Sequence, residues 1–204
     1  MQKIKKIILV PMIISLLAGC GIMKGYNVYE RVYNTYSKME SYKASVAVTS
    51  YSNNSENKYT LTQYYKCPNK QRSEYSPGNG GGSITIINGK EGKLFSDYGT
   101  DPVILDAIDI DEKDYLMLET FFEIYYSSEE TSIKTSGSDN NGTLTLRAET
   151  GNSHPYRKRI ELVIDSKSLK PKKMTVFGYD NKPALCIQYL SFELNPTLED
   201  SIFK

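Results

Sequence analysis

Residues 159–194 read RIELVIDSKSLKPKKMTVFGYDNKPALCIQYLSFEL, and their pattern is the clearest structural signal in the chain. Apolar and polar side chains alternate in three runs, which is typical of half-buried antiparallel strands. Turn-forming residues separate the runs at 166–171 and 180–183. The pattern therefore predicts three consecutive strands joined by short turns, at 159–165, 172–179 and 184–194.

The same alternation covers most of the remaining chain. Asn88-Gly89 lies between two such runs, and this dipeptide is the strongest short signal for a β-hairpin. From 101 to 111 the pattern is irregular and acidic. No internal repeat or change of composition marks a second domain, so we expect one antiparallel sheet of roughly nine to eleven strands. Further strands are predicted at 42–49, 59–65, 71–75, 83–87, 92–97, 132–135 and 143–148.

Two segments have a helical pattern instead. In residues 26–39, apolar side chains recur every three or four positions. Residues 112–126 are apolar on most sides, which is typical of a helix that is buried or covers a groove. Asp111 suits the N-cap of this second helix. The sequence therefore predicts an α+β fold, in which a large curved antiparallel sheet, an incomplete β-barrel, is covered by an N-terminal helix and a mid-chain helix.

The N-terminus has the features of an export signal. Three lysines in the first six residues precede an apolar stretch at 7–17, which is shorter than the ~20 residues that a membrane-spanning helix needs. Leu17-Ala18-Gly19-Cys20 then resembles the bacterial lipobox. The resemblance implies diacylglycerol transfer to the sulfur of Cys20, with palmitate-type acyl chains, and cleavage before this residue. The chain would then comprise a signal peptide at 1–19, a tether at 20–25 and one domain at 26–204.

This interpretation places the domain on the outer side of the cytoplasmic membrane, because two acyl chains form a stable anchor. A plain secretory signal with an incidental cysteine and an uncleaved anchor are the alternatives. Export also permits a disulfide between Cys67 and Cys186, but both lie in strand-like runs where buried free thiols are common.

Composition excludes more functions than it suggests. The chain has 204 residues, and 25 Lys and Arg against 24 Asp and Glu give no electrostatic reason to expect nucleic-acid binding. His154 is the only histidine and has no neighbouring ligand, so we expect it on a loop. Glu119 and Glu123 could form a carboxylate pair, although the solvent-facing stripe of a helix is the simpler interpretation. We therefore predict no catalytic residue, no cofactor and no metal site.

Tyrosine is the unusual component, because the chain has 17 tyrosines and no tryptophan. Tyrosine buries a large area at low entropic cost and is enriched at interfaces. It is also favoured in strands, and a low-GC coding bias raises its frequency together with that of Lys, Ile and Asn. Both interpretations stay open at this point.

Three motifs carry a resemblance to a known family. They are CPNKQRSE at 67–74, IINGK at 86–90 and IELVIDSKSLKP at 160–171, followed by a closing Phe203. In these motifs the chain resembles the outer-membrane lipoprotein carrier superfamily, the LolA/LolB-like proteins, over about residues 26–204. The resemblance implies a strongly curved, incomplete β-barrel closed by helices. In carriers, the concave face of this fold holds acyl chains.

The chain differs from the soluble carriers because it has its own lipobox, and its composition is typical of low-GC bacteria without an outer membrane. Within the superfamily it is similar to the germination lipoproteins of spore formers. This similarity implies a non-catalytic partner that binds and activates a cortex N-acetylmuramoyl-L-alanine amidase. It predicts an exposed apolar or aromatic patch of several hundred Å².

Two other functions are weighed against this one. A carrier of acyl chains or lipoproteins would need an open apolar cavity, lined by residues such as Leu61, Ile86, Leu118 and Phe122. A hydrolase would need Glu119 and Glu123 together in a cleft. An exposed strand edge would also permit a homodimer by strand exchange.

Overall fold

The computed structural model describes residues 28–52, 55–77, 81–96, 101–105, 115–137 and 142–204. The strands are β1 (Ser41–Ser52), β2 (Ser55–Lys66), β3 (Lys70–Ser76), β4 (Ser83–Asn88), β5 (Glu91–Ser96), β6 (Val103–Leu105), β7 (Thr131–Ser136), β8 (Thr143–Glu149), β9 (Arg159–Asp165), β10 (Pro171–Phe177) and β11 (Pro183–Leu194). The helices are α2 (Val28–Tyr36), α4 (Leu118–Ser127) and a final 3-10 helix, η1 (Asp200–Phe203). None of these described helices is long and apolar enough to cross a membrane.

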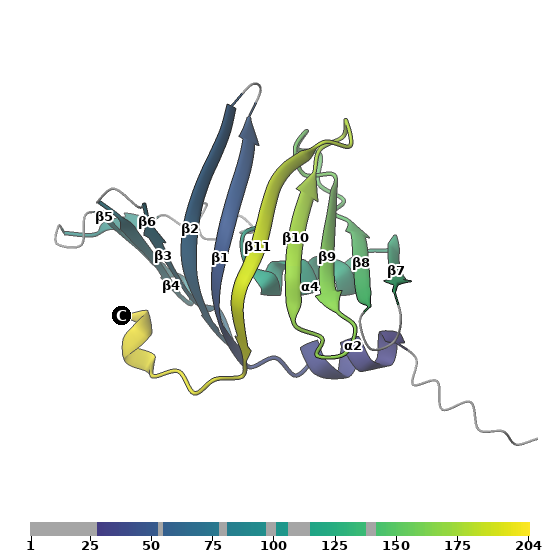
Figure 1. Ribbon diagram of the computed structural model, residues 1–204. Coiled ribbons are helices and arrows are strands. Elements are labelled where there is room, and N and C mark those ends of the chain that lie inside the picture. Colours follow the sequence, from purple (N-terminus) through teal and green to yellow (C-terminus); the bar gives the residue numbers. More distant parts are fainter. Residues whose placement is uncertain (1–27, 53–54, 78–80, 97–100, 106–114, 138–141) are drawn as a thin grey trace, which may run out of the picture.

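All strands of the described chain belong to one open antiparallel sheet, in the order β6-β5-β4-β3-β2-β1-β11-β10-β9-β8-β7 (Figure 1). Strands adjacent in sequence pair with each other, except β6 and β7, which are the two edges of the sheet. At the centre, β1 pairs with both β2 and β11. The expected α+β fold, a large curved sheet that does not close into a barrel, is confirmed. β6 was not expected as a strand, because three residues are too few to show alternation.

One face of the sheet, called the inner face below, carries the hydrophobic core. Every second residue from Tyr42 to Val48 points to this face from β1 and is at most 1% exposed. The face continues across the paired strands, because Val46 lies opposite both Leu61 of β2 and Tyr189 of β11. The buried residues of β8 to β11 include Leu144, Leu146, Ile160, Leu162, Met174 and Ile187. Such an apolar face must be covered by other elements to be stable.

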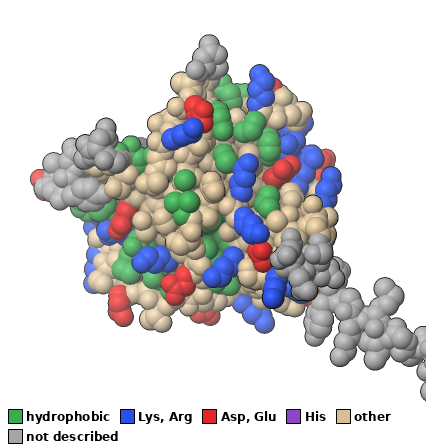
Figure 2. Space-filling view, in the orientation of Figure 1, with side chains coloured by type: hydrophobic (Ala, Val, Ile, Leu, Met, Phe, Trp, Pro, Cys, Tyr) green, Lys and Arg blue, Asp and Glu red, His purple; other side chains and the backbone are tan. Residues whose placement is uncertain are grey.

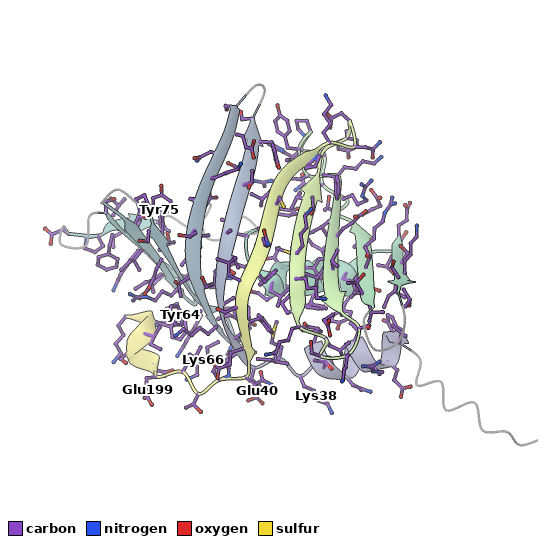
Figure 3. All side chains as sticks on the ribbon, viewed as in Figure 1. Lys38, Glu40, Tyr64, Lys66, Tyr75 and Glu199 are labelled. Atoms are coloured by element: carbon purple, nitrogen blue, oxygen red, sulfur yellow. The ribbon has the colours of Figure 1, made fainter. Side chains whose placement is uncertain are left out.

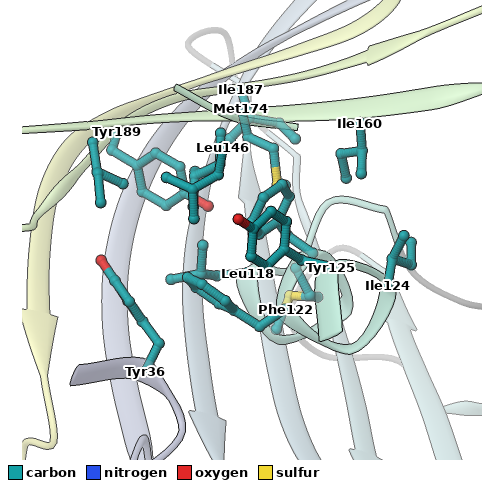
Figure 4. Packing of buried hydrophobic residues seen from close by; sticks show 14 of the residues in the cluster. Tyr36, Leu118, Phe122, Ile124, Tyr125, Leu146, Ile160, Met174, Ile187 and Tyr189 are labelled. Atoms are coloured by element: carbon teal, nitrogen blue, oxygen red, sulfur yellow. The ribbon is translucent and has the colours of Figure 1, made fainter. Parts of the chain in front are cut away.

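Helix α4 supplies most of this cover (Figure 4). Leu118 and Phe121 are 0% exposed, and Phe122 is 3% exposed. The ring of Phe122 stacks on that of Tyr36 from α2, with centroids 4.1 Å apart. The helix is therefore a central part of the core, as its apolar composition predicted.

The expected lining of a carrier cavity is packed in two separate clusters. Leu61, Leu118 and Phe122 lie in the main core together with both helices. Ile86 lies in a second cluster with the C-terminal segment. The expectation that these four side chains surround one open cavity is therefore wrong.

The N-terminus of α4 is held by a side chain of the sheet. Its N-cap residue, Met117, makes no side-chain capping hydrogen bond. Instead, the backbone N–H of Leu118 donates to the hydroxyl of Tyr42 at 3.1 Å, and this hydroxyl donates to Oε2 of Glu119 at 2.8 Å. The predicted N-cap, Asp111, lies outside the described residues, and α4 begins only at Leu118, so this prediction of the helix start is wrong.

Helix α2 is fastened to the turn between β9 and β10. Val32 and Tyr36 are its buried residues. The hydroxyl of Tyr36 donates to the backbone oxygen of Leu169 at 2.5 Å, and Nη2 of Arg31 donates to that of Ser166 at 3.0 Å. The predicted N-terminal helix is confirmed, although it ends at Tyr36, short of the predicted end.

The C-terminal segment packs against β3 and β4 in the second cluster. Phe203 is 1% exposed and contacts the group that contains Ile86 and Leu198. Nζ of Lys66 forms an ion pair with Asp200 at 2.7 Å, and Figure 3 shows Lys66 beside this segment. The closing Phe203 therefore anchors the end of the chain to the sheet.

The face of the sheet that is seen in Figure 2 carries many charged side chains of both signs. Several form ion pairs along their own strand, such as Arg147 with Glu149 at 2.8 Å and Arg159 with Glu161 at 3.1 Å. The side chains of Arg147 and Glu149 remain 42% and 20% exposed, and ion pairs that solvent reaches contribute little stability. The main core therefore lies behind this face, between the sheet and α4.

We predict that Tyr42→Phe lowers the free energy of unfolding by about 2–3 kcal/mol. The substitution leaves the N–H of Leu118 and the carboxyl of Glu119 without this buried hydrogen-bond partner. Urea unfolding at constant m-value measures the loss. Tyr64→Phe, the same change at a half-buried tyrosine of β2, should cost less than about 0.5 kcal/mol. Equal losses in the two variants would contradict the role given to Tyr42.

Candidate interaction surfaces

The two carboxylates considered for hydrolysis are not brought together in a cleft. Glu119 is 6% exposed and accepts a hydrogen bond from Tyr42 inside the core, whereas Glu123 is exposed. The interpretation of both as a solvent-facing stripe is therefore wrong for Glu119 and confirmed for Glu123. Buried carboxyls that accept hydrogen bonds from the fold commonly serve structure, and here the partner is the hydroxyl that holds α4.

The tyrosines around Glu119 have raised pKa values. Burial raises the pKa of Tyr42 and of Tyr189 well above 10, and the neighbouring Glu119 raises both further. Burial also raises the pKa of Tyr36, to which the nearby Tyr126 adds. These three hydroxyls therefore stay neutral throughout the physiological range. The hydroxyls of Tyr36 and Tyr42 are neutral hydrogen-bonding groups of the core, whereas that of Tyr189 has no hydrogen-bond partner among the described residues.

The remaining candidate residues are dispersed. His154 is exposed in the loop between β8 and β9, as predicted, and its ring lies 5.7 Å from that of Tyr156. Cys67 is exposed and Cys186 is half-buried, and both are free thiols. The expected burial of Cys67 is therefore wrong. Cys20, the predicted lipid-attachment residue, lies outside the described residues. Within the described ranges, no group of three or more His, Cys, Asp or Glu could hold a metal ion.

Three exposed tyrosines form a continuous surface across the two helices, which we call the tyrosine patch. It consists of Tyr29 and Tyr33 of α2 and Tyr126 of α4, which are 43%, 47% and 38% exposed. The rings of Tyr29 and Tyr33 stack with centroids 6.3 Å apart, and Tyr33 meets the edge of Tyr126 at 5.5 Å. Exposed aromatic groups that are already ordered by one another are suited to protein binding.

The sequence explains each half of the patch but not their contact. Tyr29 and Tyr33 are four residues apart on one helix, so they lie on the same side. Tyr126 follows Tyr125, which is 4% exposed, so one ring of this pair enters the core and the other leaves it. The stacking of Tyr36 on Phe122 then sets α2 against α4 and brings the two exposed parts together. The patch therefore depends on tertiary packing.

A second surface is a groove at the opposite end of the sheet from α2, which we call the tyrosine groove. Two adjoining depressions of about 560 and 430 Å³ share Tyr51, Ser52, Tyr156 and Ala184. They lie between the ends of the β1–β2 hairpin, the loop before β9 and the β10–β11 turn. Figure 2 shows hydrophobic side chains gathered beside the hairpin tip. The tyrosines that line the groove are Tyr51, Tyr59, Tyr115 and Tyr156.

Solved structures of other proteins share this fold. An uncharacterized protein from Thermus thermophilus matches with a TM-score of 0.54 and 14% identity, over 87% of this chain and 91% of that chain. The GerS lipoprotein in complex with the CwlD amidase from Clostridioides difficile gives a structure that matches with a TM-score of 0.51 and 24% identity, over 81% and 93%. A LolA superfamily protein from Nitrosomonas europaea matches with a TM-score of 0.43 and 12% identity, over 87% of this chain and 96% of that chain. The chain therefore shares its fold with the first two of these structures.

The particular family follows from the sequence of the whole chain. The family model described as "Sporulation protein YdcC-like" matches residues 1–203, so the chain belongs to this family of sporulation proteins. No curated protein matches the chain significantly. The predicted resemblance to LolA-like lipoproteins of spore formers is confirmed.

We predict that the free energy of unfolding falls steeply above about pH 10. A tyrosine whose pKa is raised by folding stabilises the native state fully below its unfolded pKa, and this stability is lost as the pH rises above that value. Each such tyrosine contributes a slope of about 1.4 kcal/mol per pH unit there. Urea unfolding between pH 8 and pH 11 measures the slope.

The control is Tyr189→Phe, which removes one of the buried hydroxyls and should reduce the slope above pH 10. The same slope in the original chain and in Tyr189→Phe would show that burial of this hydroxyl does not control the alkaline response.

Proposed function

We propose that the chain is a membrane-anchored, non-catalytic lipoprotein of a spore-forming bacterium that is required for germination. In this proposal it binds and activates a cortex N-acetylmuramoyl-L-alanine amidase. Membership of the sporulation family supports the cellular setting. The similarity to a structure that contains a lipoprotein with an amidase supports the class of partner. The observation in this chain that carries the proposal is the tyrosine patch.

The patch has the properties of a protein-binding surface. Its three rings come from two helices, and each retains 38–47% of its exposure although it already contacts another ring. Ordered tyrosines lose little entropy on binding and are enriched among the residues that dominate interface energies. In contrast, the buried carboxyl of Glu119 accepts a hydrogen bond from Tyr42 within the core. Binding through the exposed rings therefore uses groups that the fold does not need for its own packing.

The anchor in this proposal is Cys20, and its place in the sequence favours a short tether. Val28, where α2 starts, is eight positions after Cys20, and an extended chain spans at most about 3.5 Å per residue. The α2 end of the domain would thus stay within about 30 Å of the membrane, and the tyrosine patch would lie at this end. An amidase bound there would be held close to the membrane surface.

We predict that Tyr33→Ala combined with Tyr126→Ala weakens amidase binding by about tenfold or more. Loss of interface tyrosines commonly costs 1–2 kcal/mol each. Binding of the detergent-solubilised full chain to the purified amidase would be measured by biolayer interferometry. Tyr156→Ala is the matched control, because Tyr156 is 48% exposed but lies in the tyrosine groove. Unchanged binding by the double variant would overturn the assignment of the patch, and normal amidase activity in cells without this protein would overturn the proposed function.

We also predict that Cys20→Ala abolishes acylation of the chain. The protein should then be lost from the membrane fraction. The substituted residue has no sulfur to accept diacylglycerol, and cleavage by the lipoprotein pathway would be blocked. Fractionation and mass spectrometry of the N-terminal peptide measure both effects. Cys67→Ala, which changes an exposed thiol in the folded domain, should keep the acylated N-terminus. An acyl-free N-terminal peptide in the original chain would refute the anchor.

A further inference from the structure

We propose that the tyrosine groove is a glycan-binding site that takes an uncharged segment of a cell-wall polysaccharide. The groove is separate from the tyrosine patch and lies at the other end of the sheet (Figure 1). Its two depressions of about 560 and 430 Å³ are each of a size usual for ligand sites. Because they share four lining residues, they form one elongated site, which suits a chain of several sugar rings.

The aromatic lining is matched to pyranose rings. Every aromatic ring in the lining, apart from His154, belongs to a tyrosine, and Tyr51 and Tyr156 are 40% and 48% exposed. A tyrosine presents an apolar ring face and a hydroxyl at its edge. A pyranose ring likewise has an apolar face of C–H groups and a rim of hydroxyls. Stacking of the two faces therefore leaves both sets of hydroxyls at the edge, where they can form hydrogen bonds.

The charges in the groove favour a ligand without net charge. Asp180 and Lys182 line the same depression, and their charged groups lie 3.7 Å apart. Glu56 also lines it and forms an ion pair with Lys58 at 3.0 Å. Arg157 lines the second depression, so two acidic and two basic side chains line the groove in total. Such a lining favours neutral hydroxyl and amide groups over a strongly acidic or basic segment.

The walls of the groove are held in place before any ligand binds. The backbone N–H of Tyr179 donates to the oxygen of Pro155 at 2.9 Å, which joins the β10–β11 turn to the loop that carries Tyr156. Gly178 permits this approach, because a Cβ there would lie 2.8 Å from the same oxygen of Pro155. The ring of Tyr115 is covered by the guanidinium of Arg157, 5.0 Å from its centroid. A preformed wall reduces the entropy lost on binding.

The groove has few aliphatic side chains that a folded protein or a hydrophobic peptide could contact. The aliphatic lining consists of Ala184, Leu185, Leu116, Val176 and Pro183. Val176 is only 2% exposed, so little of it can contact a ligand. The exposed lining therefore consists mainly of the rings of Tyr51 and Tyr156, serine hydroxyls and charged side chains, together with His154 and Pro183. This largely polar and aromatic lining favours a saccharide over a peptide.

The source of the glycan, but not the chemistry of the groove, rests on the proposed function. If the α2 end of the domain is tethered to the outer side of a membrane, the groove at the opposite end points away from that membrane. The polymer it would meet there is the wall glycan, from which an N-acetylmuramoyl-L-alanine amidase removes peptides. One protein would then hold the enzyme at the tyrosine patch and the glycan strand at the tyrosine groove.

The test is isothermal titration of the detergent-solubilised full chain with a tetramer of N-acetylglucosamine and, separately, with a tetramer of glucose. Saturable binding of either tetramer is expected, and binding of only the first would show that the acetamido groups are recognised. Tyr51→Ala and Tyr156→Ala should each weaken binding about fivefold, since loss of one ring contact of about 1 kcal/mol changes an affinity by this factor. Both side chains are exposed, so the urea midpoint should be unchanged in these variants.

Tyr33→Ala with Tyr126→Ala is the control, because it changes the patch and should leave glycan affinity unchanged. Conversely, Tyr51→Ala with Tyr156→Ala should keep amidase binding, so a failure of one proposal is distinguished from a failure of the other. No binding of either tetramer would overturn the glycan site. Binding of a free wall stem peptide that is lost in Tyr156→Ala, without binding of the tetramers, would overturn it in favour of a peptide site.

Discussion

The hydroxyl of Tyr42 is the constraint on which the arrangement of the core depends. Helix α4 is so apolar that it must be buried, yet its first backbone N–H groups need acceptors where water is excluded. Tyr42 provides an acceptor to Leu118 and a donor to Glu119 from the strand at the centre of the sheet. The start of the helix is thereby fixed in position relative to β1. Because a misplaced helix would leave these groups unpaired, the hydrogen bonds select one arrangement of an otherwise non-directional apolar contact.

The pairing of β1 with β11 determines what lies at each end of the molecule. This pairing joins the two meanders, β1 to β6 and β7 to β11, into one sheet. The turns therefore alternate between two ends, and the β9–β10 turn that holds α2 is at the opposite end from the β1–β2 and β10–β11 turns. The tyrosine patch and the tyrosine groove are consequently separated by the length of the sheet. Two ligands could occupy them without contact between the ligands.

The sequence predicted the elements with regular periodicity and missed features that depend on distant contacts. Alternation located ten of the strands, and the turn motifs separated them, because each strand of this sheet has one buried face. The polarity of Glu119 suggested solvent exposure, but its partner Tyr42 is 77 positions away in the chain. Likewise, the four-residue spacing of Tyr29 and Tyr33 is visible in the sequence, whereas their contact with Tyr126 requires the packing of α2 on α4. The groove was not predicted, because its lining comes from three separate turns.

The distribution of tyrosine over these environments resolves the two interpretations of its abundance. Some tyrosines, such as Tyr36, Tyr42 and Tyr189, are buried and have a raised pKa, so they serve the core. Others are more than a third exposed and gather at the two ends of the molecule. A coding bias alone would not place exposed rings in contact with one another or around a preformed depression. Since the buried rings already satisfy the packing of the domain, the exposed ones are available for recognition, and the fold separates the two roles by the face of each element on which a ring lies.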